Sequence, residues 1–198
     1  MTNNAIFGLI FFLAFMLSAF AFPTWRTWKR TGINPFKFGN SDDAHDFAGR
    51  AFKVLIALVF AGILLHGFPD TNYMVGSIPV LSSSLIAHAG ALLCILSLVW
   101  VCVAQWQMGN SWRIGLDHDA PAPLVTAGLF KFSRNPIFLG MAVALAGLVL
   151  LIPGVLTMSC FIAGVILMNI QIRLEEAFLK PIHGADYETF TRNVRRWL

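Results

Sequence analysis

The run Arg134-Asn135-Pro136 has the composition of an anion-binding helix start. It stands directly before a long apolar stretch. Asn is a favourable N-cap, and Pro at the first helical position gives up no hydrogen bond that the helix needs. The next backbone N–H groups would lie at the positive end of the helix dipole, beside a guanidinium. The run can therefore bind a carboxylate, although an ordinary helix start with Arg134 as an interfacial anchor explains it as well.

A second charged group, Arg173-Leu174-Glu175-Glu176, follows the last apolar stretch of the chain. Two adjacent carboxylates at a membrane boundary cost desolvation energy unless partners satisfy them. On a helix they point in different directions, so one can face inward and hold an ammonium group. A solvated helix end with an internal ion pair is the alternative. Together with Arg134 and Asn135, this group suits a zwitterionic ligand that has an amino and a carboxylate group, such as S-adenosylmethionine.

The elements that must position these residues are membrane-spanning helices. Of the 198 residues, 57% are hydrophobic and 12% are charged, and the mean hydropathy is +0.71. A soluble domain carries about 25% charged residues. Apolar blocks of about 20 residues are long enough to cross the hydrocarbon core. We predict an all-α, polytopic integral membrane protein with five spans and an amphipathic C-terminal cap, the spans lying at about 5–22 (ending at Pro23), 52–68, 85–106, 137–152 and 155–170.

The positive charges predict the orientation of the spans. With the N-terminus outside, every Lys and Arg except Lys53 falls in the cytoplasmic segments 23–51, 107–136 and 171–198. Lys53 can reach the same interface by snorkelling. We therefore place the C-terminus and the candidate site on the cytoplasmic side of a membrane, taken as the bacterial inner membrane. The net charge of +4 follows this pattern, so we expect no nucleic-acid partner.

Two features concern the last pair of spans, which form a hairpin because Pro153-Gly154 interrupts the apolar region. The fourth span has about 16 residues and reaches only ~24 Å of a ~30 Å core. We expect its start to lie below the membrane surface and to leave a recess for water and a polar cofactor. Small residues such as Gly147 and Gly164 could bring helices together within the chain or between copies, so the oligomeric state stays open.

The stretch 128–140, GLFKFSRNPIFLG, resembles the G-x-Y-x-x-x-R-H-P-x-Y-x-G motif of the isoprenylcysteine carboxyl methyltransferase and phospholipid methyltransferase superfamily. Three further elements are similar to that superfamily in the same order. They are Gly109-Asn110-Ser111-Trp112-Arg113, Glu175-Glu176-x-x-Leu179 and Gly184-x-x-Tyr187-x-x-Phe190. The resemblance covers about residues 105–198. We divide the chain into spans 1–104 and a methyltransferase-like region 105–198 within one structural unit.

The resemblance implies a membrane methyltransferase that binds S-adenosylmethionine near the cytoplasmic face, between the last two spans. Arg134, Asn135 and Pro136 would line the cofactor pocket, and Glu175 or Glu176 would bind the amino group. Tyr187 would belong to a C-terminal cap over the cofactor. Asn135 stands where His is commoner in the family, and in this interpretation it still caps the helix.

The acceptor does not follow from the sequence. Lipophilic or amphiphilic carboxylates, thiols and lipid amines all suit a site among membrane helices. Arg173 or Arg113 would orient an anionic acceptor, and methyl transfer needs no metal. An amine acceptor would need a base, for which the candidates are His118, Asp117, Asp119 and His183.

Two other functions remain as alternatives. Sterol reductases that use NADPH resemble the same superfamily in their C-terminal half. Such an enzyme would need cations for the extra phosphates, and these could come from Lys131, Arg134, Arg192, Arg195 and Arg196. A membrane binding or scaffold protein without catalytic activity is the second alternative. Cofactor binding discriminates among the three.

Overall fold

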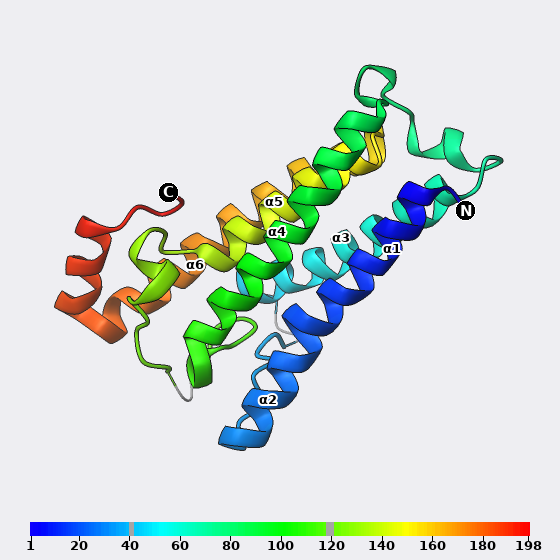
Figure 1. Ribbon diagram of the computed structural model, residues 1–198. Coiled ribbons are helices and arrows are strands. Elements are labelled where there is room, and N and C mark those ends of the chain that lie inside the picture. The colour runs from blue at the N-terminus through cyan, green and yellow to red at the C-terminus, as the bar shows by residue number, and fades with distance from the viewer. Residues whose placement is uncertain (40–41, 118–120) are drawn as a thin grey trace.

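The computed structural model describes residues 1–39, 42–117 and 121–198, and it consists of helices joined by short connections (Figure 1). In these ranges there is no strand, only two isolated bridges, so the all-α prediction is confirmed. The main helices are α1 (Asn3–Met16), the π-helical η1 (Leu17–Ala21), α2 (Phe22–Thr31), α3 (Ala44–Gly67), α4 (Ser84–Met108), α5 (Pro136–Leu151) and α6 (Val155–Asn193). The short 3-10 turns are η2 (Asn72–Val75), η3 (Pro79–Leu81), η4 (Gly109–Ser111) and η5 (Gly128–Lys131).

Four helical stretches are long and apolar enough to cross a membrane, namely Asn3–Thr31, Ala44–Gly67, Ser84–Ser111 and Val155–Asn193. Helix α5 is as apolar but has 16 residues. The chain therefore has the helices of an integral membrane protein, as predicted. The count of five spans and their orientation stay predictions.

The helices alternate in direction along the bundle. The Thr2 N–H donates to the Gly67 carbonyl at 3.0 Å, and the Asn4 side chain donates to the Leu151 carbonyl at 3.1 Å. The start of α1 and the ends of α3 and α5 therefore meet at one end of the molecule. Helix α2 and the C-terminus lie toward the other end (Figure 1). This arrangement is the one that alternating spans require.

The first helix does not end at Pro23, contrary to our prediction. It continues from Asn3 to Thr31 through the π-helical turn η1. Proline cannot donate to the carbonyl four residues earlier, which is that of Ala19. That carbonyl accepts a hydrogen bond of 2.6 Å from the side-chain amide of Gln105 on α4. The Gln105 side chain therefore donates a hydrogen bond in this turn, where Pro23 has no N–H, and the helix can continue.

A second predicted boundary was wrong. Helix α3 begins at Ala44, not near residue 52, because the Asp43 carboxylate caps it by accepting the Asp46 N–H at 2.7 Å. Helix α6 continues through Pro181. Its kink falls at Gly184, whose φ of 48° suits glycine. The predicted break between the last two apolar helices is confirmed at residues 152–154.

Five helices enclose a central space. Following their contacts, α1 packs on α4, α4 on α5, α5 on α6, α6 on α3, and α3 on α1. The buried core takes side chains from each of these five helices, among them Phe15, Leu55, Val101, Leu148 and Cys160. The ring explains how residues far apart in sequence come to share one cavity.

The closest packing joins α4 to α5 through glycines. An ideal Cβ on Gly90 would lie 2.6 Å from the backbone nitrogen of Leu151 and 2.7 Å from the carbonyl oxygen of Gly147. On Gly147 it would lie 2.8 Å from Sγ of Cys94. Small residues allow membrane helices to approach in this way. The glycines therefore serve packing within the chain and fix the position of α5 along α4.

We expect Gly90→Ala to destabilise the protein by about 1–3 kcal/mol, because its methyl group meets backbone atoms that cannot move without separating α4 from α5. Gly62→Ala is the matched control, since a Cβ there meets the flexible end of Leu156 at 3.3 Å. Thermal unfolding of the detergent-solubilised variants measures both. Equal midpoints for the two variants would contradict the close contact.

Candidate functional site

A cavity of about 1050 Å³ lies inside the ring of helices. Helices α1, α3, α4, α5 and α6 all contribute to its wall, and α2 and the connections at residues 34–38 and 112–115 close one end. Most of the lining is aromatic or aliphatic. Cavities that bind cofactors and drug-sized ligands commonly have about 300–1,000 Å³. This one is large enough for a cofactor together with part of a lipid.

The polar lining residues gather at one end of the cavity. Those from α4, the segment after it, the entry of α5 and the polar part of α6 are Gln105, Arg113, Arg134, Asn135, Gln171 and Glu175. Thr24, Asn34 and Lys53 also line the cavity. The apolar part continues toward Phe11, Val59 and Leu148. The cavity is therefore amphipathic along its length, as an amphiphilic ligand requires.

Arg134, Asn135 and Pro136 line this cavity at the start of α5. Pro136 is the first residue of the helix, as predicted. The capping prediction for Asn135 was wrong, because its side chain makes no hydrogen bond to the helix start. Its amide donates instead to the carbonyl of Arg196 at 2.9 Å. The C-terminal residues compete for the side chain, so the first N–H groups of α5 lack that cap.

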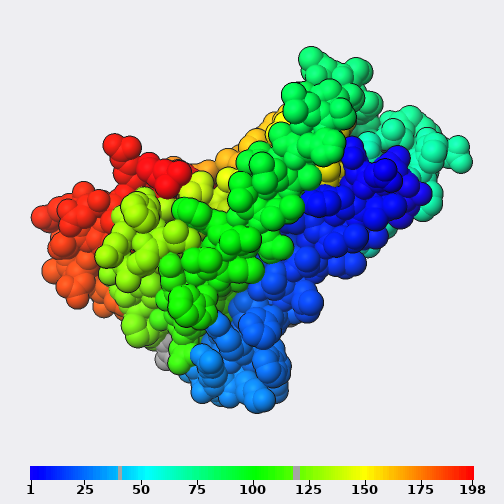
Figure 2. Space-filling model, viewed as in Figure 1, coloured from blue at the N-terminus to red at the C-terminus, as the bar shows by residue number. Residues whose placement is uncertain are grey.

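The C-terminal segment 194–198, called the strap below, crosses the entry of α5. The backbone N–H of Arg134 donates to the Arg195 carbonyl at 2.9 Å, and the Ser133 hydroxyl lies 3.4 Å from the Arg196 carbonyl. Figure 2 shows the C-terminal residues, in red, lying against the yellow-green connection that precedes α5. Backbone groups thus hold the strap in place.

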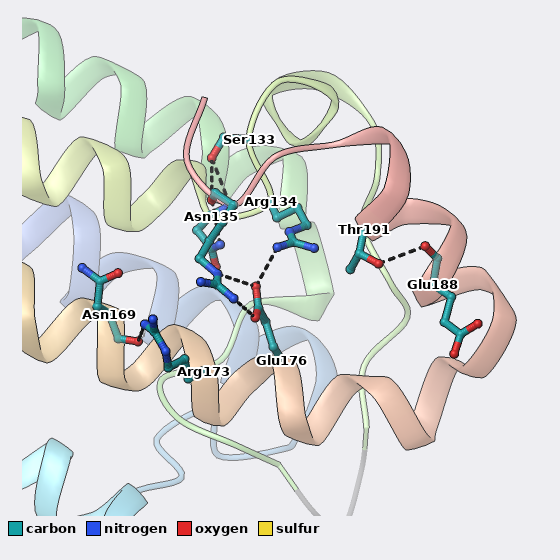
Figure 3. A network of polar contacts seen from close by, with 9 residues as sticks. Ser133, Arg134, Asn135, Asn169, Arg173, Glu176, Glu188 and Thr191 are labelled. Carbon is teal, nitrogen blue, oxygen red and sulfur yellow. Dashed lines mark hydrogen bonds and ion pairs between the residues drawn. The ribbon is translucent and has the colours of Figure 1, made fainter.

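Glu176 joins the strap to the site through its side chain (Figure 3). Its carboxylate accepts from Arg134 at 3.0 Å and from two nitrogens of Arg196 at 2.9 and 2.6 Å. The hydrogen bonds to Glu176 raise the pKa of the Arg196 guanidinium above its ordinary value. Two guanidinium groups therefore occupy the Glu176 carboxylate, which does not line the cavity.

Glu175 points the other way and lines the cavity. Its carboxylate accepts from the side-chain amide of Gln171 at 3.3 Å, and within the described residues it forms no ion pair. Gln171 is 2% exposed, and its Oε1 has no hydrogen-bond partner in the described part of the chain. The two side chains leave acceptor oxygens available for an ammonium group.

Arg173 and Tyr187 do not line the cavity. Arg173 is exposed and donates to the Asn169 carbonyl of its own helix at 3.1 Å (Figure 3). Tyr187 packs with Phe130 and Phe190 in a second apolar cluster, which fixes the folded-back end of α6 against η5. Tyr187 therefore lies in the folded-back end of α6, where the cluster around it is apolar.

Arg113 lines the cavity and is held by Asp117. Its Nε lies 3.1 Å from the Asp117 carboxylate, which also pairs with Lys37 at 2.9 Å. A backbone bridge between Phe36 and Ile114 joins the same two connections. This arrangement orients Arg113 and engages Asp117 as a counter-ion, so that carboxylate is poorly suited to act as a base.

None of the other candidate bases within the described residues lines the cavity. His118 and Asp119 lie outside the described residues. His183 lies on α6 and does not line the cavity. His45, which the sequence did not single out, accepts the Leu116 N–H at 2.9 Å and stacks on Phe38. It does not line the cavity.

The cations that an NADPH-dependent reductase would need for its extra phosphates do not gather at the cavity. Of the five, only Arg134 lines it. Arg196 binds Glu176, and Arg192 lies 3.7 Å from Glu188 on the exposed side of α6. Lys131 is exposed at the end of η5. These five residues therefore do not form a cluster of cations that could bind the phosphates of NADPH.

Sequence reasoning missed two residues that line the cavity. Gln105 and Gln171 sit in apolar stretches, where a single amide has no periodic signal. It named Arg196 as a cation for a phosphate but did not predict its contact with Glu176. The absence of a helical donor for the Ala19 carbonyl, caused by Pro23, is the one signal that could have pointed to a buried side-chain donor such as Gln105.

These features define a class: a polytopic helical membrane protein with an amphipathic internal cavity. The family model for phospholipid methyltransferase matches residues 85–186, just over half of the chain. The chain therefore belongs to the phospholipid methyltransferase family, within the superfamily that the sequence motifs indicated. The match begins at α4, earlier than the motifs did. No curated protein matches the chain.

We expect Glu176→Gln to loosen the strap. Hydrogen bonds to charged groups contribute roughly 1.5–3 kcal/mol each, so trypsin should cleave at Arg195 and Arg196 about tenfold faster than in the wild type. Glu175→Gln is the matched control, because Glu175 has no contact with the strap. Time courses followed by mass spectrometry measure the cleavage, and equal rates in the two variants would refute the role given to Glu176.

Proposed function

We propose that the protein is an S-adenosylmethionine-dependent membrane methyltransferase that acts on a lipophilic or amphiphilic acceptor. The observation that carries the proposal is the amphipathic cavity, whose polar end combines Arg134 and the start of α5 with Gln171 and Glu175. Membership of a methyltransferase family supports the same reaction.

The unsatisfied polar atoms of the cavity fit this cofactor. Nε of Arg134 is a buried donor and Oε1 of Gln171 a buried acceptor, and neither has a partner among the described residues. Glu175 adds a carboxylate with one hydrogen bond. A ligand with an ammonium and a carboxylate group would satisfy both the buried donor and the buried acceptors. Glu175 and Gln171 would hold the ammonium, and Arg134 with the first N–H groups of α5 would hold the carboxylate.

When bound, S-adenosylmethionine would supply an electrophilic methyl group on a sulfonium sulfur. The side chains of this protein would then bind, orient and exclude water. Glu176 would keep Arg134 in place, and the strap would cover the entry of α5. The apolar lining from α1, α3 and α5 would hold the hydrocarbon part of the acceptor beside the polar end.

An acceptor that is already an anion needs no base, and Arg113, which lines the cavity, could orient it. Arg173, exposed on α6, would have to act at the outer rim if it takes part. We retain the orientation with the N-terminus outside, and we place the polar end of the cavity on the cytoplasmic side, because the basic residues gather at that end of the chain's spans.

Isothermal titration calorimetry of the detergent-solubilised protein tests cofactor binding. We expect micromolar affinity for S-adenosylmethionine, with Glu175→Gln and Arg134→Ala each weakening it by about tenfold, or about 1.4 kcal/mol. Lys180→Ala, an exposed change on the same helix as Glu175, should leave the affinity unchanged.

The alternatives give different results in the same experiment. Binding of NADPH without S-adenosylmethionine would replace the proposal by a reductase. Binding of neither would favour a scaffold. Binding of S-adenosylmethionine would move the work to a screen of carboxylate, thiol and amine acceptors.

Reporter fusions test the orientation. Alkaline phosphatase inserted after residue 77, between α3 and α4, should be active because that connection is predicted to lie outside. The same reporter after residue 116 should be inactive, and a fluorescent protein on the C-terminus should fluoresce. The opposite pattern would place the candidate site outside the cell.

A further inference from the structure

Gln105 on α4 is a buried amide to which the proposed cofactor site assigns no role. It is 4% exposed, and it lines the cavity. Its Nε2 donates to the Ala19 carbonyl at 2.6 Å, while its Oε1 has no hydrogen-bond partner among the described residues.

The orientation of this amide is fixed by chemistry. A carbonyl oxygen can only accept a hydrogen bond, so the nitrogen of Gln105 must face Ala19 and the oxygen must face away. Pro23 leaves the Ala19 carbonyl without its helical donor, which makes the contact with Gln105 necessary. The amide therefore cannot turn over to satisfy its own oxygen.

The register of α4 and α5 places Gln105 at the polar end of the cavity. Gly147 lies against Cys94, and Gly140 lies against Val101. Since the two helices are antiparallel, one more turn along each sets Gln105 opposite Pro136. Gln105 thus lies at the level of the α5 entry, on the wall that α4 shares with α1, whereas Gln171 and Glu175 belong to α6.

A buried carbonyl oxygen without a partner is unfavourable, and a ligand that brings a donor relieves the cost. The helices that carry Gln105 and its partner Ala19 also contribute apolar side chains to the cavity, among them Phe15 and Met108. An amphiphile whose tail lies along this wall would bring its head group to the amide. An ionised carboxylate carries no donor and would meet the oxygen unfavourably.

We propose that the side-chain oxygen of Gln105 accepts a hydrogen bond from an O–H or N–H in the head group of the lipophilic acceptor, and so selects acceptors that carry such a donor. This inference rests on the proposed function, because it takes the amphiphile beside Gln105 to be the methyl acceptor. Gln105 orients the head group and exchanges no proton with it.

Binding of two isomeric probes tests the proposal without the cofactor. Decan-1-ol has a donor, and 1-methoxynonane has the same atoms without one. Titrations use protein in lipid nanodiscs, with empty nanodiscs as the reference for partitioning. The fluorescence of the cavity-lining Trp25, Trp28 and Trp112 reports occupancy. We expect the wild type to prefer decan-1-ol by about tenfold.

The decisive variant is Pro23→Ala/Gln105→Leu. Alanine adds a backbone N–H to this turn, four residues after Ala19 and five after Ser18. The double variant therefore removes the acceptor oxygen while offering the turn's carbonyls another donor. Pro23→Ala alone is the control and should keep the preference. The double variant should bind both probes equally and unfold at the temperature of the control.

Two results would overturn the proposal: equal affinity of the wild type for both probes, as expected if water satisfies Gln105, or a preference that survives in the double variant. Calorimetry with S-adenosylmethionine on the same samples separates this outcome from failure of the proposed function. Either of these two results, with cofactor binding intact, rejects the role of Gln105 alone. A donor preference without cofactor binding supports Gln105 as a ligand contact and rejects the methyltransferase.

Discussion

The length of α5 is the constraint on which the site depends. A helix of 16 residues cannot match its longer neighbours at both ends. Its far end is fixed, because glycines hold it against α4 and because residues 152–154 connect it to α6. The polar start of α5 therefore has to fall short of the ends of α4 and α6. This places Arg134 and Asn135 in the wall of the cavity instead of at the outer end of the bundle.

Polar groups drawn into the bundle need partners, and the strap supplies them. Its carbonyl oxygens accept from the Arg134 backbone and the Asn135 side chain. Glu176 places a carboxylate between two guanidinium groups, which balances charges that would be costly to leave unpaired. Because adjacent residues on a helix point in different directions, Glu175 is free to face the cavity. The two carboxylates thus have different roles, one in the structure of the site and one in its binding surface.

The sequence was enough to predict the apolar helices, the break between α5 and α6, and the family, because these depend on composition and on local motifs. It was enough to indicate that Arg134 and the pair Glu175-Glu176 share one site, although it could not separate the two carboxylates. That separation depends on Arg196, which reaches Glu176 only because α6 turns back at Gly184. Pro23 misled the prediction of the first helix, since the donor that replaces its missing N–H comes from Gln105, more than eighty residues away. Long-range satisfaction of backbone groups has no local signal.

The membrane itself determines which contacts can select an acceptor. In water, each buried methylene contributes about 0.8 kcal/mol to binding. An acceptor that comes from the bilayer leaves one apolar environment for another, so its tail contributes much less. Phe11, Val59 and Leu148 can accommodate a hydrocarbon chain but can discriminate little between chains. Selection then falls on the few polar groups at the other end of the cavity. Their scarcity is what makes each unsatisfied amide oxygen there informative about the ligand.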